Sequence, residues 1–289
     1  MDVFQIKIDD DRPIQLNVKN YERYTKKSDP FYIIENNKLK YYAICPACKN
    51  PIQVINLYVD KKFDENNNKL PLYAKHVKRS VIGVADYLQE AYDNCPMANP
   101  NKFGGNEKHR NKKLRNEIVS LIKFYPVVLF NEIRSITGID FSEKAFGKMI
   151  NTFIKAEGFY YKYITKYNLP YGFLNMQKSI SIYNNKLYPS SIKNELIDNI
   201  NKSNFFQFNK FHITPKSKDM FCEIVIYLAN HKFDKKFESE TIEIIIEEKF
   251  EEVSNVVYEK TIELNLEKYI NTIEKQKRIN SLTNNIILE

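Results

Sequence analysis

The run Cys-Pro-Ala-Cys, at residues 45–48, is the pattern in this sequence that most clearly indicates chemistry. Two thiolates separated by two residues can bind one metal ion from a tight turn. A closed tetrahedral site needs two more ligands, and His76 and Cys95 are the natural choices along the chain. Sulfur and imidazole ligands in this combination are typical of Zn²⁺. The sequence therefore predicts one structural zinc ion bound by Cys45, Cys48, His76 and Cys95.

Other interpretations of these residues remain open. His109 is the alternative fourth ligand, but its neighbours Lys108 and Arg110 would make the site more electropositive, so His76 is preferred. A redox dithiol needs its CxxC at the start of a helix, whereas Pro51 and a strand-like run follow here. Three free or buried cysteines beside an exposed histidine are the plainest alternative. Four protein ligands would leave no open position for water, so we expect a structural zinc rather than a catalytic one.

The surroundings of this pattern resemble a known family. The strand-like Tyr41-Tyr42-Ala43-Ile44 runs into Cys-Pro-x-Cys, and a further strand leads to Tyr73-Ala74-Lys75-His76. Residues 31–98 in this way resemble the zinc-finger-like N-terminal region of CoiA-like competence proteins, in which a nuclease domain follows. Tyr73 stands where that family has its first histidine, with Cys95 as the candidate replacement. The resemblance implies a protein that handles DNA.

Basic side chains in the middle of the chain could contact the phosphates of a nucleic acid. The basic residues between 108 and 115 could instead belong to a solvated linker and helix face. A pair of helices, at 127–137 and after Ser142, has the outline of a helix-turn-helix, although its turn is long and an ordinary helical hairpin is the rival interpretation. The candidate nucleic-acid-binding residues are Lys108, Arg110, Lys112, Lys113, Arg115, Lys144 and Lys148.

An aromatic run at 159–173 and an acidic strand further on allow two more interpretations. The tyrosines of the run could stack on unpaired bases, or could form core and interface. Asp234, Glu247 and Lys249 have the order of a PD-(D/E)xK nuclease, whose carboxylates hold a divalent ion while the lysine stabilises developing charge. An amphipathic strand with an acidic face explains the same residues without catalysis.

Composition excludes several classes of protein. The chain of 289 residues is 43% hydrophobic and carries a net charge of +8, which is typical of a globular protein. It has only 7 glycines and neither GxGxxG nor GxxxxGK[ST], which argues against dinucleotide-binding and P-loop folds. No run of 18 apolar residues and no secretory leader pattern is present. Four cysteines are too few for a disulfide scaffold, so we expect a cytoplasmic protein without a membrane partner.

Local patterns predict an α+β protein with three parts: a zinc-binding β-rich module at 1–100, a helical segment with a candidate helix-turn-helix at 110–174, and an α+β domain with an antiparallel sheet at 175–289. Strands are predicted in 2–18, 31–58, 179–187 and 205–266, and a polar loop at 60–70. Gly138 is the predicted end of the helix at 127–137. The other helices are predicted at 80–94, from 110 to Pro126, from 142 to about 158, at 190–202 and at 267–277.

Charge divides the chain, because residues 234–275 carry −6 while residues 1–233 carry +13. The sequence favours a zinc-stabilised, non-catalytic protein that binds nucleic acid, DNA before RNA, as a subunit of a bacterial defence or mobile-element complex. Two alternatives stay open: the metal-dependent nuclease, and an interaction subunit that docks on a larger protein through its acidic C-terminal region.

Overall fold

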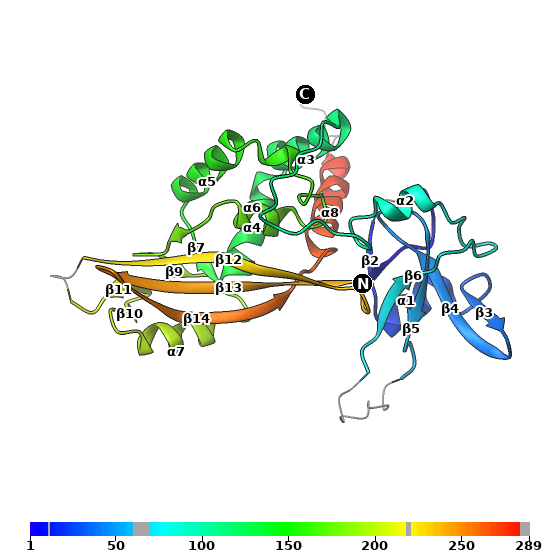
Figure 1. Cartoon of the computed structure of the whole chain (residues 1–289), viewed down its shortest axis with the longest axis horizontal. Coiled ribbons are helices and arrows are strands. Elements are labelled where there is room, and N and C mark those ends of the chain that lie inside the picture. Colours follow the sequence, from blue (N-terminus) through cyan, green and yellow to red (C-terminus); the bar gives the residue numbers. More distant parts are fainter. Residues whose placement is uncertain (11, 60–69, 218–220, 284–289) are drawn as a thin grey trace. The chain divides into compact units, whose positions relative to one another are not determined.

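The computed structural model describes residues 1–10, 12–59, 70–217 and 221–283 (Figure 1). It confirms the α+β class, because helices accompany several antiparallel sheets. The chain divides into two compact units. Unit 1 comprises residues 1–101, 233–240 and 265–289, and unit 2 comprises residues 102–232 and 241–264.

Unit 1 is built on a four-stranded antiparallel sheet in the order β3-β4-β5-β6. The predicted strands within 2–18 are confirmed as the pair β1 and β2, and the hairpin and following strand predicted at 31–58 are confirmed as β3, β4 and β5. The elements of this unit are β1 (Val3–Phe4), β2 (Ile14–Gln15), α1 (Val18–Thr25), β3 (Tyr32–Glu35), β4 (Lys38–Ile44), β5 (Pro51–Ile55), β6 (Tyr73–His76), α2 (Gln89–Asp93) and α8 (Lys268–Thr283).

The helix predicted at 80–94 is wrong over most of its length. Only α2 is helical, and residues 81–85 instead form a tight turn closed by a bridge between Val81 and Ala85. Gly83 takes a positive φ of 75° in this turn, which interrupts a helix. The apolar side chains of the turn pack on Tyr42 and Ile44 of β4, so burial against the sheet has overridden the helical spacing.

Unit 2 begins with helices whose boundaries follow the predicted signals. Pro126 starts α4, Gly138 ends it in the left-handed conformation, and the Ser142 side chain accepts a hydrogen bond from the backbone N–H of Ala145 at the start of α5. The helical elements are α3 (Lys112–Phe124), α4 (Pro126–Thr137), α5 (Glu143–Lys155), η1 (Gly158–Tyr160), α6 (Leu169–Asn175) and α7 (Lys193–Lys202).

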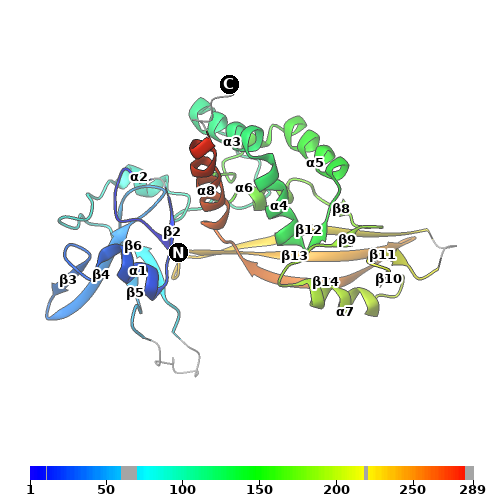
Figure 2. The ribbon, with the colours of Figure 1, turned by 180° about the vertical axis from the view of Figure 1, so that it is seen from behind.

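Long strands of unit 2 form the antiparallel meander that the alternating sequence predicts, in the order β14-β13-β12-β8. Figure 2 shows α4, α5 and α6 on one side of this sheet and α7 on the other. The strands are β7 (Ile139–Asp140), β8 (Ile180–Ser181), β9 (Lys186–Leu187), β10 (Phe206–Asn209), β11 (His212–Pro215), β12 (Cys222–Asp234), β13 (Ser239–Phe250) and β14 (Val253–Glu263). The turn end of the β12–β13 hairpin, residues 233–240, belongs to unit 1.

The core of the helical part is aromatic. Phe153 of α5 stacks on Phe173 of α6 at 5.0 Å between ring centroids, and both side chains are fully buried. Gly158 passes so close to the Phe153 ring that a Cβ would lie 2.4 Å from it. Phe173 thus belongs to this core, at the end of the aromatic run at 159–173. The polar loop predicted at 60–70 lies, apart from residue 70, outside the described residues.

Candidate metal centre and basic surface

Four side chains of unit 1 converge as the sequence predicts. The sulfur and imidazole nitrogen atoms of Cys45, Cys48, His76 and Cys95 all lie within 4.8 Å of one another. Cys45, His76 and Cys95 are buried, and Cys48 is partly exposed. This cluster could hold one metal ion, and no other such group of His, Cys, Asp or Glu occurs among the described residues.

The turn between β4 and β5 positions the first two sulfur atoms. Ile44 pairs with Pro51 across the strands, and the backbone N–H of Cys45 donates to the carbonyl of Asn50 at 2.9 Å. Lys49 adopts a left-handed φ of 63°, which reverses the chain directly after Cys48. The Cys-Pro-Ala-Cys segment is therefore the connection of a hairpin, and both sulfurs leave it on one side.

Two further segments bring in the remaining ligands. β6 pairs with β5, and its register sets His76 opposite Ile52. The Asn50 side chain accepts from the backbone N–H of Leu88 at 2.8 Å and donates to the Leu88 carbonyl at 3.0 Å. These two hydrogen bonds fix the segment that enters α2, and α2 leads directly to Cys95. The short helix thus returns the chain to the cluster, although it is shorter than predicted.

Distances within the cluster fit a tetrahedral ion. With Zn–S near 2.3 Å and Zn–N near 2.0 Å, tetrahedral geometry requires about 3.8 Å between two sulfurs and about 3.5 Å between sulfur and nitrogen. The Sγ atoms of Cys45 and Cys95 are 3.8 Å apart. His76 Nε2 lies 3.3 Å from Cys48 Sγ and 3.6 Å from Cys95 Sγ. The donor set is closed, since four protein ligands complete a tetrahedron.

Protonation of the cluster favours thiolate at the partly exposed sulfur. Hydrogen bonds from Cys45 and Cys95, with a weaker one from the backbone of Asn50, lower the pKa of Cys48 to about 4 against the effect of burial. Burial raises the pKa of Cys45 well above its usual value, and hydrogen bonds to Cys48 and Cys95 add to this. A divalent cation would displace the protons that these crowded thiols share, because metal binding requires the thiolate form.

A residue that sequence reasoning missed completes the surroundings of the cluster. Glu238, in the turn between β12 and β13, accepts a hydrogen bond at 2.6 Å from His76 Nδ1 and another at 3.1 Å from the His76 backbone N–H. Burial alone would lower the pKa of His76, but hydrogen bonds with Cys95 and Glu238 raise it to about 9. Metal-binding histidines commonly have such a carboxylate on the second ring nitrogen.

His109, the alternative ligand, is not part of this cluster. Its Nδ1 accepts from the backbone N–H of Asn111 at 3.1 Å, and its own backbone N–H donates to the Tyr160 carbonyl at 2.8 Å. Burial, followed by the charge of Lys162, lowers the pKa of His109. This histidine therefore serves the entry to α3, while His76 supplies the nitrogen of the cluster.

The basic residues near the start of α3 divide into two groups. Lys108 pairs with Glu157 at 2.9 Å, and the Arg115 guanidinium lies over the ring of Phe159 at 5.1 Å. Both side chains are thereby held against the η1 region. Arg110, Lys112 and Lys113 are exposed, and no ion pair joins them to another described residue. These three are the cations of this segment that remain available to a phosphate.

α5 carries a second basic strip. Lys144 and Lys148, four residues apart, are exposed on the face opposite the buried Phe146, Met149 and Phe153. Between α4 and α5 the chain forms β7, which pairs with β9. The connection of the predicted helix-turn-helix thus contains a short strand, and recognition by α5 stays a prediction.

Aromatic residues of the 159–173 run are mostly internal. Tyr163, Tyr167, Tyr171 and Phe173 are buried, whereas Phe159, Tyr160 and Tyr161 are half-buried. The rings that pack beneath α5 and α6 are unavailable for stacking on bases in this structure.

Asp234 of the nuclease pattern lies at the β12–β13 turn, whereas Glu247 and Lys249 lie together further along β13. Asp234 accepts from the backbone N–H of Lys236 at 2.7 Å and so closes the β12–β13 turn. Glu247 lies eight residues beyond the start of β13, about 26 Å at 3.3 Å per residue. There it accepts from the Tyr227 hydroxyl at 2.9 Å and lies 3.6 Å from the Lys249 ammonium. Each carboxylate has a local partner, and the nuclease stays a prediction.

Part of the acidic charge of the C-terminal region is internal. Glu248 is only 1% exposed and accepts hydrogen bonds from the Ser203 hydroxyl and from the backbone N–H groups of Asn204 and Phe205. Glu238, Glu240 and Glu243 are also buried. Of the exposed carboxylates, Asp234 ends β12 and the others lie on or beside β14, and docking through them stays a prediction; those on or beside β14 are Glu251, Glu252, Glu259 and Glu263.

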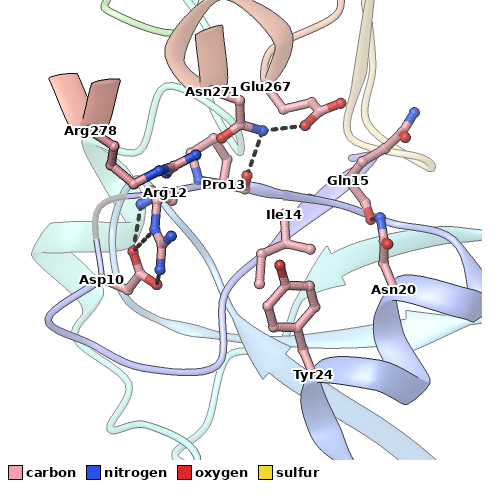
Figure 3. Close-up of a pocket in the computed structure, with 10 residues that line it drawn as sticks. All are labelled: Asp10, Arg12, Pro13, Ile14, Gln15, Asn20, Tyr24, Glu267, Asn271 and Arg278. Carbon is pink, nitrogen blue, oxygen red and sulfur yellow. Dashed lines mark hydrogen bonds and ion pairs between the residues drawn. The ribbon is translucent and has the colours of Figure 1, made fainter. Parts of the chain in front are cut away.

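A pocket of about 270 Å³ in unit 1 lies between the β2–α1 region and α8 (Figure 3). Arg12 forms two 3.0 Å contacts with Asp10, through Nε and Nη2. Burial raises the pKa of Glu267, and the nearby charge of Asp2 adds to this against a hydrogen bond from Asn271. Two guanidinium and two carboxylate groups cancel in formal charge, so the lining favours neither an anion nor a cation. It consists of Asp10, Arg12, Pro13, Ile14, Gln15, Asn20, Tyr24, Glu267, Asn271 and Arg278.

Comparisons with protein-family models, with curated proteins and with solved structures found no match for this chain. Within the described part of the chain, no helix has the length and apolar character needed to cross a bilayer. The features of the chain that bear on function are therefore the metal cluster and the distribution of charge.

Proposed function

We propose that this chain is a zinc-stabilised protein that binds nucleic acid and has no catalytic centre of its own. One structural Zn²⁺ would be held by Cys45, Cys48, His76 and Cys95. The observations that support this metal are three distances among the sulfur and nitrogen atoms that match a tetrahedral zinc site, and a buried carboxylate on the other ring nitrogen of His76. An ion held by four protein ligands has no position for a reacting water, which supports a structural role.

Exposed cations of unit 2 support the proposed binding of nucleic acid. Residues 102–166 contain thirteen basic and six acidic side chains, a net charge of +7. Arg110, Lys112 and Lys113 project from the start of α3, and α5 carries Lys144 and Lys148. Both helices contact η1, so the helices that carry the two basic groups are neighbours in unit 2. Phosphates are the partner that such a surface attracts, with duplex DNA as the first candidate and RNA as the second.

Elemental analysis tests the metal. Wild-type protein should contain about one zinc per chain, and Cys48→Ser should lose most of it and unfold at a lower temperature, because structural zinc contributes folding free energy. Cys222→Ser is the matched control, since Cys222 lies outside the cluster. Zinc-free wild type from zinc-supplemented cells, or full zinc content in Cys48→Ser, would contradict the proposal.

Fluorescence anisotropy with labelled duplex DNA, single-stranded DNA and RNA tests the partner. Binding should weaken steeply between 50 and 200 mM salt, as expected when lysine and arginine displace counterions from phosphates. The absence of salt-dependent binding to all three probes would remove nucleic acid as the partner and leave the zinc assignment intact.

A further inference from the structure

The zinc cluster and the turn between β12 and β13 meet through Glu238. The Glu238 side chain is 9% exposed and that of His76 is 1% exposed, so their 2.6 Å contact is shielded from water. The same carboxylate also accepts from the His76 backbone N–H at 3.1 Å. Two hydrogen bonds from one residue to another 162 positions away define both the position and the ring orientation of His76.

This contact determines which nitrogen of His76 can bind a metal. A neutral imidazole carries one proton, and a carboxylate at Nδ1 requires that proton to lie on Nδ1. The lone pair is then on Nε2, the nitrogen that lies 3.3 Å from Cys48 Sγ and 3.6 Å from Cys95 Sγ. Without the carboxylate, either tautomer and a rotated ring would become accessible, and metal affinity would fall.

The turn itself is held on the N-terminal sheet by few other contacts. Phe237 packs edge-on against Tyr73 of β6, with ring centroids 5.0 Å apart, and its carbonyl accepts a hydrogen bond from the N-terminal ammonium group of Met1. Its neighbour Lys236 is exposed, and Glu238 adopts a left-handed φ of 47°. The two buried, charge-assisted hydrogen bonds of Glu238 add to these contacts in holding the turn.

We infer that Glu238 is a positioning residue of the metal centre, and that zinc binding and docking of residues 235–240 on the N-terminal sheet stabilise each other through it. This inference rests on the proposed zinc site. Because coupling between two events is reciprocal, loss of the ion should loosen the turn, and loss of the carboxylate should weaken the ion.

Zinc competition against a chromophoric chelator tests one direction. Glu238→Ala should weaken zinc binding roughly 10–100-fold, the range for partners of metal-binding histidines, and Glu238→Gln should recover part of the loss because its amide oxygen still accepts from Nδ1–H. Glu252→Ala removes an exposed carboxylate and should leave the affinity unchanged. In wild type, ¹⁵N-NMR should show zinc on Nε2 and the proton on Nδ1 of His76, and the Glu238→Ala spectrum should lose this single tautomer.

Hydrogen–deuterium exchange tests the other direction on unaltered protein. Removal of zinc from wild type should accelerate exchange at residues 235–240 as well as at 45–50. Zinc-loaded Glu238→Ala should exchange fast at 235–240 while residues 45–50 stay protected. Wild type that binds no zinc would refute the proposed function. Wild type that binds zinc while Glu238→Ala keeps full affinity, or whose turn is insensitive to zinc, would refute this inference alone.

Discussion

At the scale of single residues, the candidate metal centre combines four side chains from residues 45–95 with one carboxylate, Glu238, from a distant part of the chain. The spacing of Cys45 and Cys48 is enough to predict them as metal ligands. His76 and Cys95 follow as the nearest side chains that can complete a zinc site. Glu238 carries no local signal, because it is one of twelve acidic residues between 234 and 275. A histidine ligand implies that some carboxylate or carbonyl lies behind it, but only the fold decides which one.

Glu35 offers a prediction at the same scale. Its carboxylate lies 2.9 Å from Lys40 Nζ and 2.7 Å from Arg79 Nη2, and hydrogen bonds from these two cations lower its pKa to about 2. A lowered pKa in the folded state means stabilisation that is complete above the unfolded value near 4.5 and is lost as pH falls toward 2. Glu35→Gln should therefore destabilise the protein at pH 7, with a deficit that shrinks below pH 4.5.

Urea denaturation of wild type and Glu35→Gln at a series of pH values measures this deficit. Any effect of acid on the proposed zinc site is common to both proteins, so the difference between them isolates Glu35. A deficit that is independent of pH would show that the carboxylate acts through packing rather than charge. Glu252→Gln, at an exposed position, should match wild type throughout.

At the scale of elements, local signals predicted helix ends better than helix existence. Pro126, Gly138 and Ser142 each act within one turn of backbone, and each stands at the predicted boundary. The predicted helix at 80–94 failed because its apolar spacing serves another purpose: Val81 and Val84 are buried against Tyr42. A periodic pattern shows which residues are buried, and a nearby sheet can bury them without a helix.

Gly138 and Gly147 provide a matched pair for testing an element boundary. At Gly138, φ is +69° and an added Cβ would lie 2.6 Å from Leu196 Cδ1. Gly138→Ala should therefore cost about 1–3 kcal/mol of unfolding free energy. At Gly147, inside α5, the space is open, so Gly147→Ala should be neutral or stabilise by up to ~1 kcal/mol. Urea midpoints of the two variants measure the contrast, and equal midpoints would contradict it.

At the scale of the whole molecule, charge is sorted between surface and interior. The C-terminal strands hold much of the acidic charge, but part of it is buried. Glu248, for example, accepts hydrogen bonds from backbone N–H groups of the loop after α7. The segment 102–166 keeps its positive side chains mainly at the surface. Counting acidic and basic residues in the sequence predicts the sign of the net charge of each region. It does not predict which charged side chains are exposed, because that depends on how the chain packs.

Charge reversal tests where the proposed nucleic-acid surface lies. The triple variant Arg110→Glu, Lys112→Glu and Lys113→Glu should reduce the slope of log affinity against log salt by about three, one for each lost phosphate contact. A control with the same change in net charge reverses three exposed lysines elsewhere in unit 2. If control and test variants weaken binding equally, long-range attraction rather than this surface would explain it. The control positions are Lys186, Lys202 and Lys210.

The 162 positions between His76 and Glu238 also set an order of events during synthesis. All four sulfur and nitrogen ligands leave the ribosome while the partner carboxylate is still untranslated. Cys95, the last of the four, precedes Glu238 by 143 positions, and at ~5–20 residues per second this separation lasts about 7 to 29 s. A zinc ion captured early, as proposed, would first be bound by a His76 ring that can still rotate, and Glu238 would fix that ring only after it has been synthesised.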